Sequence, residues 1–282
     1  MDSFLVGLVG TGIGPSLSPA LHEREAGRLG LRYLYRRLDL DELGLPAERV
    51  GEVLAAARLA GYDGLNVTHP CKQLVLAHLD DVHPTAAALG AVNTVVFAGD
   101  RAIGHNTDTT GFARAVEVGL PGVPLDRVVL LGAGGAGAAC AHALLSLGAQ
   151  RVDVFDRKPE VAAALADRLG ADRVVAIRDL DDALAAADGL VHATPTGMDA
   201  QPGLPLPAAA LDRRLWVADI VYRPLNTPLV AAARARGCRV LDGGRMAVFQ
   251  AADSFRLFTG HTPDADRMLA HFATLEAPCP AP

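Results

Sequence analysis

The segment NVTHPCKQ (66–73) gathers polar side chains that could do chemistry around a proline. They are Asn66, Thr68, His69 and Lys72. The preceding residues, 58–65, alternate apolar and small side chains and indicate the approach to a buried strand. A surface turn after Pro70 would explain the polarity. A ligand site would explain it too, because α/β sheets bind ligands at the carboxyl ends of their strands. The two interpretations differ in whether other polar clusters converge on this strand end.

A glycine-rich segment, GAGGAG (132–137), has the residue types of a dinucleotide-binding turn. It follows DRVVLL, which predicts a buried strand, and precedes AACAHALLSLG, which predicts a helix. In G-x-G-x-x-G the glycines allow a tight turn, a close approach of the backbone to a pyrophosphate, and close packing of the helix. The N-terminus of that helix then faces the phosphates. The alternative is a purely structural glycine turn.

The strand predicted next, RVDVF, is followed by Asp156. Dinucleotide-binding units place an acidic residue about 20 residues after the glycines. A carboxylate there accepts hydrogen bonds from the ribose hydroxyls of NAD and repels the 2′-phosphate of NADP. Arg157 argues the other way, because a guanidinium pairs with that phosphate or stacks on adenine. We expect NAD as the cofactor, with NADP as the less favoured alternative.

A second glycine run, GTGIGP (10–15), lacks this context. Pro15 interrupts it where a helix should begin, and the third glycine is missing. Ser16 and Ser18 follow as short hydrogen-bond donors just before a predicted helix, which suits a substrate carboxylate. Ser18 is also placed to cap that helix, with Pro19 at its first position, and the two roles are compatible.

Other polar side chains border apolar runs. Asn93 stands before the strand-like VVF, and Asp108 lies between a short strand and a helix in GHNTDTTGF. Tyr222 ends WVADIVY, and Gln250 lies in GGRMAVFQ. Taken singly, Asn93 is explained as a turn residue, Asp108 as a helix N-cap and Gln250 as a solvated helix position.

The clusters lie on alternating strand and helix patterns, which are typical of parallel α/β sheets. The pattern changes around 108–125, and strand–helix units restart at Arg127. We therefore expect an N-terminal α/β substrate-binding catalytic domain with a mostly parallel sheet (1–110). A Rossmann-type NAD-binding domain (111–245) would follow, with a cleft between the two domains. A last long helix, roughly 246–259, begins a C-terminal segment (246–282) expected to pack back on the first domain.

Composition narrows the class of protein. The 282 residues are 50% apolar, enough for a sizeable core, and the formal net charge of −6 argues against a nucleic-acid partner. No apolar run reaches the length of a membrane span, and the N-terminus lacks a basic leader region, so a cytoplasmic protein is expected. The cysteines, Cys71, Cys140, Cys238 and Cys279, have no metal-like spacing and are interpreted as reduced thiols. We expect no metal site. Cys71, beside Lys72, could alternatively be a reactive thiol.

Together the motifs resemble the shikimate dehydrogenase family from one end of the chain to the other. The resemblance is carried, in order, by GTGIGPSLSPALHE, NVTHPCKQ, GAVNTVV, GHNTDTTGF, GAGGAG, ATPTGM, DIVYRPLNTPL and GGRMAVFQ. RMAVFQ and FRLFTG, with Asp156, are more similar to the NAD-using quinate/shikimate dehydrogenases than to the NADP-using biosynthetic type. One residue departs: His192 stands where the family often has Asn, and we expect a hydrogen-bonded structural histidine there.

The resemblance implies reversible oxidation of a ring hydroxyl of shikimate or quinate to 3-dehydroshikimate or 3-dehydroquinate, with hydride transfer to the nicotinamide. Such a cytoplasmic oxidoreductase, a monomer or homodimer, would serve the shikimate pathway of aromatic amino acid biosynthesis or quinate catabolism. One alternative is the NADP-dependent biosynthetic shikimate dehydrogenase. Another is a non-catalytic NAD-binding regulator, which would be expected to have lost Lys72 or Asp108.

The resemblance also implies residue roles. Lys72 and Asp108 would be the catalytic pair and would contact the substrate. The substrate carboxylate would be bound by Ser16, Ser18 and Tyr222, and the ring hydroxyls by Thr68, Asn93, Asp108 and Gln250. The cofactor site would be lined by Gly132, Ala133, Gly134, Gly135, Ala136, Gly137, Asp156, Arg157, Thr194, Val221 and Gly243.

Hydride leaves the alcohol carbon only as the hydroxyl proton departs, so an acid–base group must contact that oxygen. A neighbouring carboxylate favours the charged form of a lysine, whereas burial opposes it. We expect Lys72 to transfer the proton and stabilise the alkoxide, with Asp108 orienting it and binding the substrate. The strand end at 66–73 would then be polar because it supplies Thr68 and Lys72 to a polyol.

Overall fold

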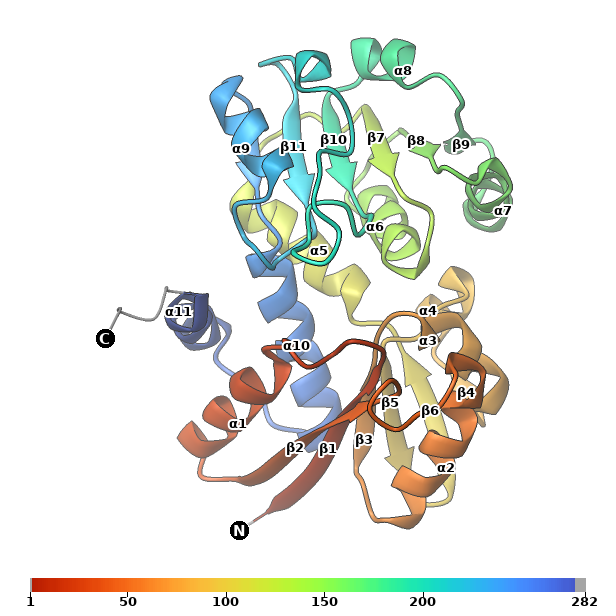
Figure 1. Cartoon of the computed structure of the whole chain (residues 1–282), viewed down its shortest axis with the longest axis vertical. Coiled ribbons are helices and arrows are strands. Elements are labelled where there is room, and N and C mark those ends of the chain that lie inside the picture. The colour runs from red at the N-terminus through yellow and green to blue at the C-terminus, as the bar shows by residue number, and fades with distance from the viewer. Residues whose placement is uncertain (1, 277–282) are drawn as a thin grey trace. The chain divides into compact units, whose positions relative to one another are not determined.

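The computed structural model describes residues 2–276 and divides into two compact units (Figure 1). The N-terminal unit holds the residues up to 107 together with those from 250 onwards. The second unit holds residues 108–249. Each unit contains one sheet, with helices connecting its strands.

In the described chain, the N-terminal unit is built on a mixed six-stranded sheet in the order β2-β1-β3-β5-β6-β4. The strands are β1 (Ser3–Gly10), β2 (Arg32–Asp39), β3 (Gly64–Val67), β4 (Asp81–Val82), β5 (Thr94–Ala98) and β6 (Arg101–His105). β1 is parallel to β2 and β3, whereas β5 is antiparallel to β3 and β6. The carboxyl ends of β1, β3 and β6 therefore share one edge of the sheet with the amino end of β5.

Helices and 3-10 turns accompany the sheet of this unit. They are α1 (Ser18–Arg28), the 3-10 turn η1 (Ala47–Arg49), α2 (Val50–Leu59), α3 (Cys71–Leu74), the 3-10 turn η2 (Val75–His78), α4 (Pro84–Leu89), α10 (Gly244–Thr259), which starts in the other unit, and α11 (Ala265–Glu276). In α2 the buried residues are Val50, Val53, Leu54 and Ala57, the spacing of one helix face. They join Val9, Leu65 and Val95 in the core.

The prediction that residues 58–65 lead into a buried strand is wrong for the first residues of this stretch. α2 continues to Leu59, whose side chain is 88% exposed because the buried face of the helix ends at Ala57. Gly61, with a φ of 79°, then reverses the chain in the left-handed region that glycine tolerates. Only Gly64–Val67 forms the strand, and there every residue is buried.

The C-terminal helix α11 is attached to α1, beside which it lies in Figure 1. Glu25 of α1 is 2% exposed, and its carboxylate accepts hydrogen bonds from Arg267 Nε and from the backbone N–H of Asp264, both at 2.8 Å. A buried carboxylate needs such charged and polar donors to offset its lost hydration. Glu25 therefore fixes the position of α11 in the N-terminal unit.

Within the described residues, the second unit contains a parallel six-stranded sheet in the order β12-β11-β10-β7-β8-β9. Its strands are β7 (Arg127–Leu131), β8 (Arg151–Phe155), β9 (Val174–Ala176), β10 (Gly189–His192), β11 (Trp216–Asp219) and β12 (Arg239–Leu241). Its helices are α5 (Asp108–Gly119), α6 (Gly135–Ser146), α7 (Pro159–Leu169), α8 (Leu180–Ala186), the 3-10 turn η3 (Ala208–Ala210) and α9 (Pro228–Ala235). Read from β9, this is the doubly wound Rossmann order, which confirms the expected two-domain α/β fold.

Candidate active site

The polar segment 66–73 lies at the edge of the N-terminal sheet where β1 and β3 end. The backbone N–H of Thr11 donates to the carbonyl of His69 at 3.1 Å. A Cβ added to Gly10 would lie 2.4 Å from Thr68 Cγ2, so only glycine permits this approach. The structure therefore joins the loop after β1 to the segment after β3.

Lys72 lies in α3, the short helix that follows Pro70. Its carbonyl accepts a hydrogen bond from the backbone N–H of Val92 at 2.8 Å, which ties the turn to the residue before Asn93. The side chain of Lys72 is partly exposed. Pro70 thus ends the extended segment, as a turn requires, and the same turn holds Lys72 beside the start of β5.

Asn93 lies at this edge with 3% of its surface exposed. Its Oδ1 accepts hydrogen bonds from the backbone N–H of Thr107 at 2.8 Å and from the Thr94 hydroxyl at 3.0 Å, while its Nδ2 donates to Thr107 Oγ1 at 3.0 Å. Thr107 directly precedes Asp108. The amide of Asn93 is therefore not a solvated turn residue, because it fixes the backbone that leads into Asp108.

Asn66 supports Asn93, a role that the sequence did not reveal. Asn66 is 7% exposed, and its Oδ1 accepts a hydrogen bond from Tyr35 Oη at 2.8 Å. Its Nδ2 donates to Thr94 Oγ1 at 3.1 Å. Thr94 in turn donates to Asn93 Oδ1. Asn66 therefore helps to orient the side-chain amide of Asn93 through Thr94.

The loop 10–15 is held by Asp39, a residue that sequence analysis did not single out. Asp39 ends β2 and is 5% exposed. Its Oδ1 accepts from the backbone N–H of Gly12 at 3.1 Å and its Oδ2 from that of Ile13 at 2.8 Å. A carboxylate that accepts backbone N–H groups is an effective clamp on a glycine loop.

Ser16 and Ser18 follow this loop with their hydroxyl oxygens 3.2 Å apart. Both are partly exposed. The expected capping role of Ser18 is wrong: α1 already begins at Ser18, and the cap position is occupied by Leu17, which makes no side-chain cap hydrogen bond in the described chain. Adjacent hydroxyls on a helix N-terminus suit a carboxylate ligand.

The remaining predicted substrate residues are divided between the units. Gln250 lies in α10 and belongs to the N-terminal unit, like Ser16, Ser18, Thr68, Lys72 and Asn93. Asp108 and Tyr222 belong to the second unit. Asp108 is the first residue of α5 and is 6% exposed, a place where the helix dipole favours a carboxylate. Tyr222 follows β11 and is partly exposed.

In the second unit the glycines of 132–137 each meet a different requirement. Gly132 has a φ of 99°. A Cβ added to Gly137 would lie 2.0 Å from the carbonyl oxygen of Gly132. A Cβ added to Gly134 would meet nothing within 4 Å among the described residues. Gly132 therefore makes the turn, Gly137 lets α6 pack on it, and Gly134 leaves space above the helix N-terminus. These glycines fit a dinucleotide pyrophosphate.

Asp156 contacts this turn directly. Its Oδ2 accepts the backbone N–H of Ala133 at 2.8 Å, and its Oδ1 accepts that of Lys158 at 2.9 Å. The side chain is partly exposed, and each carboxylate oxygen has a further lone pair to offer a ribose hydroxyl. Arg157 is exposed beside it.

The other predicted cofactor residues also follow strands of this sheet. Thr194 follows β10, and its Cγ2 lies 2.9 Å from where a Cβ on Gly132 would be. Val221 follows β11, and its carbonyl oxygen lies 2.5 Å from where a Cβ on Gly243 would be. Thr194 therefore packs against the glycine turn, and Val221 packs against the residue after β12.

Two further expectations concern His192 and Cys71. His192 is fully buried with both ring nitrogens hydrogen-bonded, as expected of a structural histidine. Cys71 is fully buried, and burial raises the pKa of its thiol to about 11, so the reactive-thiol alternative is wrong. Cys140 and Cys238 are also buried and form no disulfide among the described residues, and Cys279 lies outside those residues.

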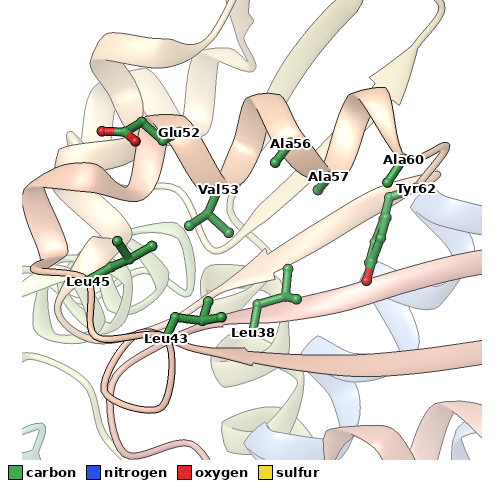
Figure 2. Close-up of a pocket in the computed structure, with 9 residues that line it drawn as sticks. All are labelled: Leu38, Leu43, Leu45, Glu52, Val53, Ala56, Ala57, Ala60 and Tyr62. Carbon is green, nitrogen blue, oxygen red and sulfur yellow. The ribbon is translucent and has the colours of Figure 1, made fainter.

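An apolar pocket of about 430 Å³ lies elsewhere in the N-terminal unit, between α2 and the end of β2 (Figure 2). Its lining includes Leu38, Leu43, Leu45 and Val53, with Glu52 as the charged member. None of the predicted site residues lines it. Over residues 2–276, the structure has no helix that could cross a membrane and no cluster of His, Cys, Asp and Glu side chains suited to a metal ion.

A dinucleotide turn on a Rossmann sheet, together with an α/β unit whose strand ends carry hydroxyl, amide and ammonium groups, defines an NAD(P)-dependent oxidoreductase. Comparison with known proteins names the family. Residues 8–95 match the model "Shikimate dehydrogenase substrate binding domain", residues 118–198 match "Shikimate / quinate 5-dehydrogenase", and residues 244–271 match "Shikimate 5'-dehydrogenase C-terminal domain".

Similar proteins include both cofactor types. "Shikimate dehydrogenase (NADP(+))" of Streptomyces avermitilis is 64% identical, covering 97% of this chain and 96% of that protein. "Quinate/shikimate dehydrogenase (NAD(+))" of Corynebacterium efficiens is 49% identical, covering 97% and 99%. The solved quinate dehydrogenase of Corynebacterium glutamicum in complex with NAD has a TM-score of 0.90 at 47% identity, covering 97% of this chain and 100% of that one.

The chain belongs to the shikimate dehydrogenase family. It is an oxidoreductase that acts on a CH–OH group with NAD(P).

Proposed function

We propose that this chain is an NAD-preferring dehydrogenase that reversibly oxidises a ring hydroxyl of shikimate or quinate. Family membership does not choose the cofactor, because similar relatives carry NADP(+) and NAD(+) in their names. The observation that supports NAD is the carboxylate of Asp156, held 2.8 Å from the N–H of Ala133 in the glycine turn. It stands at the carboxyl end of β8, where this fold binds the adenosine ribose.

The charge of Asp156 argues for the smaller cofactor. A carboxylate accepts both ribose hydroxyls of NAD, whereas the 2′-phosphate of NADP brings a second negative charge to the same place. Arg157 lies beyond the end of β8 and is exposed. Solvent therefore weakens an ion pair between its guanidinium and a 2′-phosphate. We therefore assign the larger effect to Asp156.

On the substrate side, we assign proton transfer to Lys72 and orientation of that lysine to Asp108. Bound nicotinamide supplies the hydride acceptor. Lys72 Nζ takes the proton of the reacting hydroxyl, which lets the carbon–oxygen double bond form, and returns it in the reverse direction. The positive charge that Lys72 gains with this proton stabilises the alkoxide. The backbone N–H of Val92 donates a hydrogen bond to the carbonyl of Lys72 and so fixes the turn. A fixed turn suits a side chain that must contact the reacting hydroxyl oxygen of the substrate.

The other substrate residues hold the ring in place. We assign Ser16, Ser18 and Tyr222 to the substrate carboxylate, because their neutral hydroxyl groups can donate hydrogen bonds to its oxygens. We assign Thr68, Asn93 and Gln250 to the ring hydroxyls. The N-terminal unit would thus supply most of the substrate residues, and the unit of residues 108–249 would bind the dinucleotide and supply Asp108 and Tyr222 to the substrate.

The test is a matrix of kcat/KM values for shikimate and quinate, each with NAD and NADP. We expect the larger kcat/KM with NAD for whichever substrate is turned over faster. Equal or faster turnover with NADP would overturn the cofactor assignment in favour of the NADP-dependent biosynthetic enzyme. Binding of NAD without turnover of either substrate would instead indicate a non-catalytic regulator.

A further inference from the structure

We propose that a buried pair, His192 and Asp219, positions the strand ends that hold the dinucleotide. The inference rests on the proposed function, because it takes the carboxyl edge of the second sheet as the cofactor site. His192 and Asp219 end the neighbouring strands β10 and β11 and stand opposite each other in register. They are 0% and 2% exposed. His192 Nδ1 lies 2.9 Å from Asp219 Oδ1.

The surroundings of Asp219 set the direction of these hydrogen bonds. Its Oδ1 also accepts the backbone N–H of Val221 at 3.0 Å, and its Oδ2 accepts the hydroxyl of Thr227 at 2.6 Å. An ionised carboxylate only accepts, so Nδ1 of His192 carries the hydrogen of their contact. In the neutral ring Nε2 is then an acceptor.

Thr194 is the partner of that acceptor. Its Oγ1 lies 2.5 Å from His192 Nε2, so in the neutral ring the hydroxyl of Thr194 donates its hydrogen to Nε2. The same oxygen accepts the backbone N–H of Thr196 at 3.3 Å. Thr194 is thereby fixed with its Cγ2 against Gly132, the first glycine of the dinucleotide turn. Towards a ligand its hydroxyl offers an acceptor, which suits an N–H or O–H group of the dinucleotide better than a phosphate.

Asp219 holds a second strand end in the same way. The backbone of Val221 is bonded to Asp219 Oδ1, and the carbonyl of Val221 packs against Gly243 after β12. Thr227 caps α9 by accepting the N–H of Val230 at 3.1 Å while it donates to Asp219. One buried carboxylate and one ring therefore fix the segments after β10 and β11 and the start of α9.

At position 192 a histidine contacts both Asp219 and Thr194, which an asparagine is too short to do. The amide nitrogen of an Asn side chain reaches about as far as Nδ1 of a histidine, and that of Gln about as far as Nε2. His192→Asn therefore keeps the contact to Asp219 and loses the one to Thr194. His192→Gln keeps a group near Thr194 and loses the Nδ1 contact.

The test is the dissociation constant of NAD, measured by titration of His192→Asn, Thr194→Val and the double variant. We expect each single variant to weaken NAD binding about five- to tenfold, the loss of one hydrogen bond. The double variant should be little weaker than Thr194→Val alone, because His192→Asn acts through the Thr194 hydroxyl, which that variant already lacks. KM for the alcohol substrate at saturating NAD should change little. His261→Asn, in an exposed pair with Asp2 in the N-terminal unit, is the matched control and should bind NAD like the unsubstituted chain.

A different result is expected if His192 and Asp219 only stabilise the fold and do not affect cofactor binding. His192→Asn would then lower the melting temperature and leave the NAD dissociation constant unchanged, which would overturn the inference. Fully additive losses in the double variant would also overturn it. If His192→Asn does not fold, Thr194→Val decides, since unchanged NAD affinity in that variant contradicts the inference. Absence of NAD binding by the unsubstituted chain would overturn the proposed function itself, a result distinguishable from both.

Discussion

The Oδ2 atom of Asp156 accepts a hydrogen bond from the backbone N–H of Ala133 at 2.8 Å. The carboxylate proposed to bind the ribose therefore also accepts a hydrogen bond from the glycine turn proposed to bind the pyrophosphate. Substitution of Asp156 should therefore affect both the cofactor preference and the geometry of this turn.

Replacement of Asp156 by Ser should narrow the preference for NAD over NADP in kcat/KM. The substitution removes the charge that repels a 2′-phosphate and leaves Arg157 to pair with it. Asp156→Asn is the matched control for shape, because its Oδ1 can still accept a backbone N–H while its charge is gone. If charge decides, both variants narrow the gap. An NAD/NADP ratio that stays fixed in both would show that Asp156 does not discriminate.

Two glycines of the turn should respond differently to alanine. Gly137→Ala places a Cβ 2.0 Å from the carbonyl oxygen of Gly132, so both the free energy of unfolding and NAD affinity should fall. Gly134→Ala meets no described atom within 4 Å, so its methyl group occupies only the space proposed for the pyrophosphate. Its melting temperature should therefore stay near that of the unsubstituted chain while NAD affinity falls. Unchanged NAD affinity in Gly134→Ala would place the pyrophosphate elsewhere.

Substitution of Ser18 by Ala should raise KM for the acidic substrate more than it lowers kcat. The hydroxyl is assigned to the carboxylate, which does not change during the reaction, so ground state and transition state lose the same contact. A hydrogen bond to a charged group is worth about 1.5–3 kcal/mol, so KM should rise roughly tenfold or more. Ser3→Ala, at the exposed start of β1, is a control that should change neither constant. A collapse of kcat at constant KM would assign Ser18 to the chemistry.

Acid should destabilise the protein through His22. Complete burial lowers the pKa of His22 from 6.5 to about 3. Between these values the unfolded chain binds a proton that the folded chain does not, so the free energy of unfolding falls as pH drops, by about 1.4 kcal/mol per pH unit for this one group.

The check is urea unfolding at pH 7, 5 and 4 for the unsubstituted chain and His22→Asn, whose amide can still bond Tyr33 Oη, 3.0 Å from His22 Nδ1. His22→Asn should lose less stability between pH 7 and pH 4, because it has no group that titrates there. Parallel losses in the two proteins would mean that His22 does not control acid stability.

Most elements could be predicted from the sequence because their signals are local. The dinucleotide turn shows this: β7, 132–137 and α6 are consecutive in the chain, and the apolar run, glycines and helix pattern are read in one window. The same is true of the polar residues after β3, where strand end and proline are adjacent.

The parts that were missed depend on contacts between distant residues. Asp39 clamps the loop after β1 through Gly12 and Ile13, which lie 27 and 26 residues earlier. Asn66 reaches Tyr35 across 31 residues. Ser18 was expected at a cap, but Leu17 takes the position, a one-residue shift that the sequence signal does not settle. A side chain whose partners are set by strand order has no signature in its own neighbourhood.

The central claim, that the strand end at 66–73 carries the chemistry, is tested most directly by kcat of Lys72→Ala. We predict a loss on the order of 10²–10⁴-fold, the usual cost of losing proton transfer. NAD affinity should be kept, because the glycine turn lies in the other unit. Lys72→Arg should not restore kcat, since a guanidinium stays protonated. A kcat for Lys72→Ala near that of the unsubstituted enzyme, with both substrates, would contradict the account.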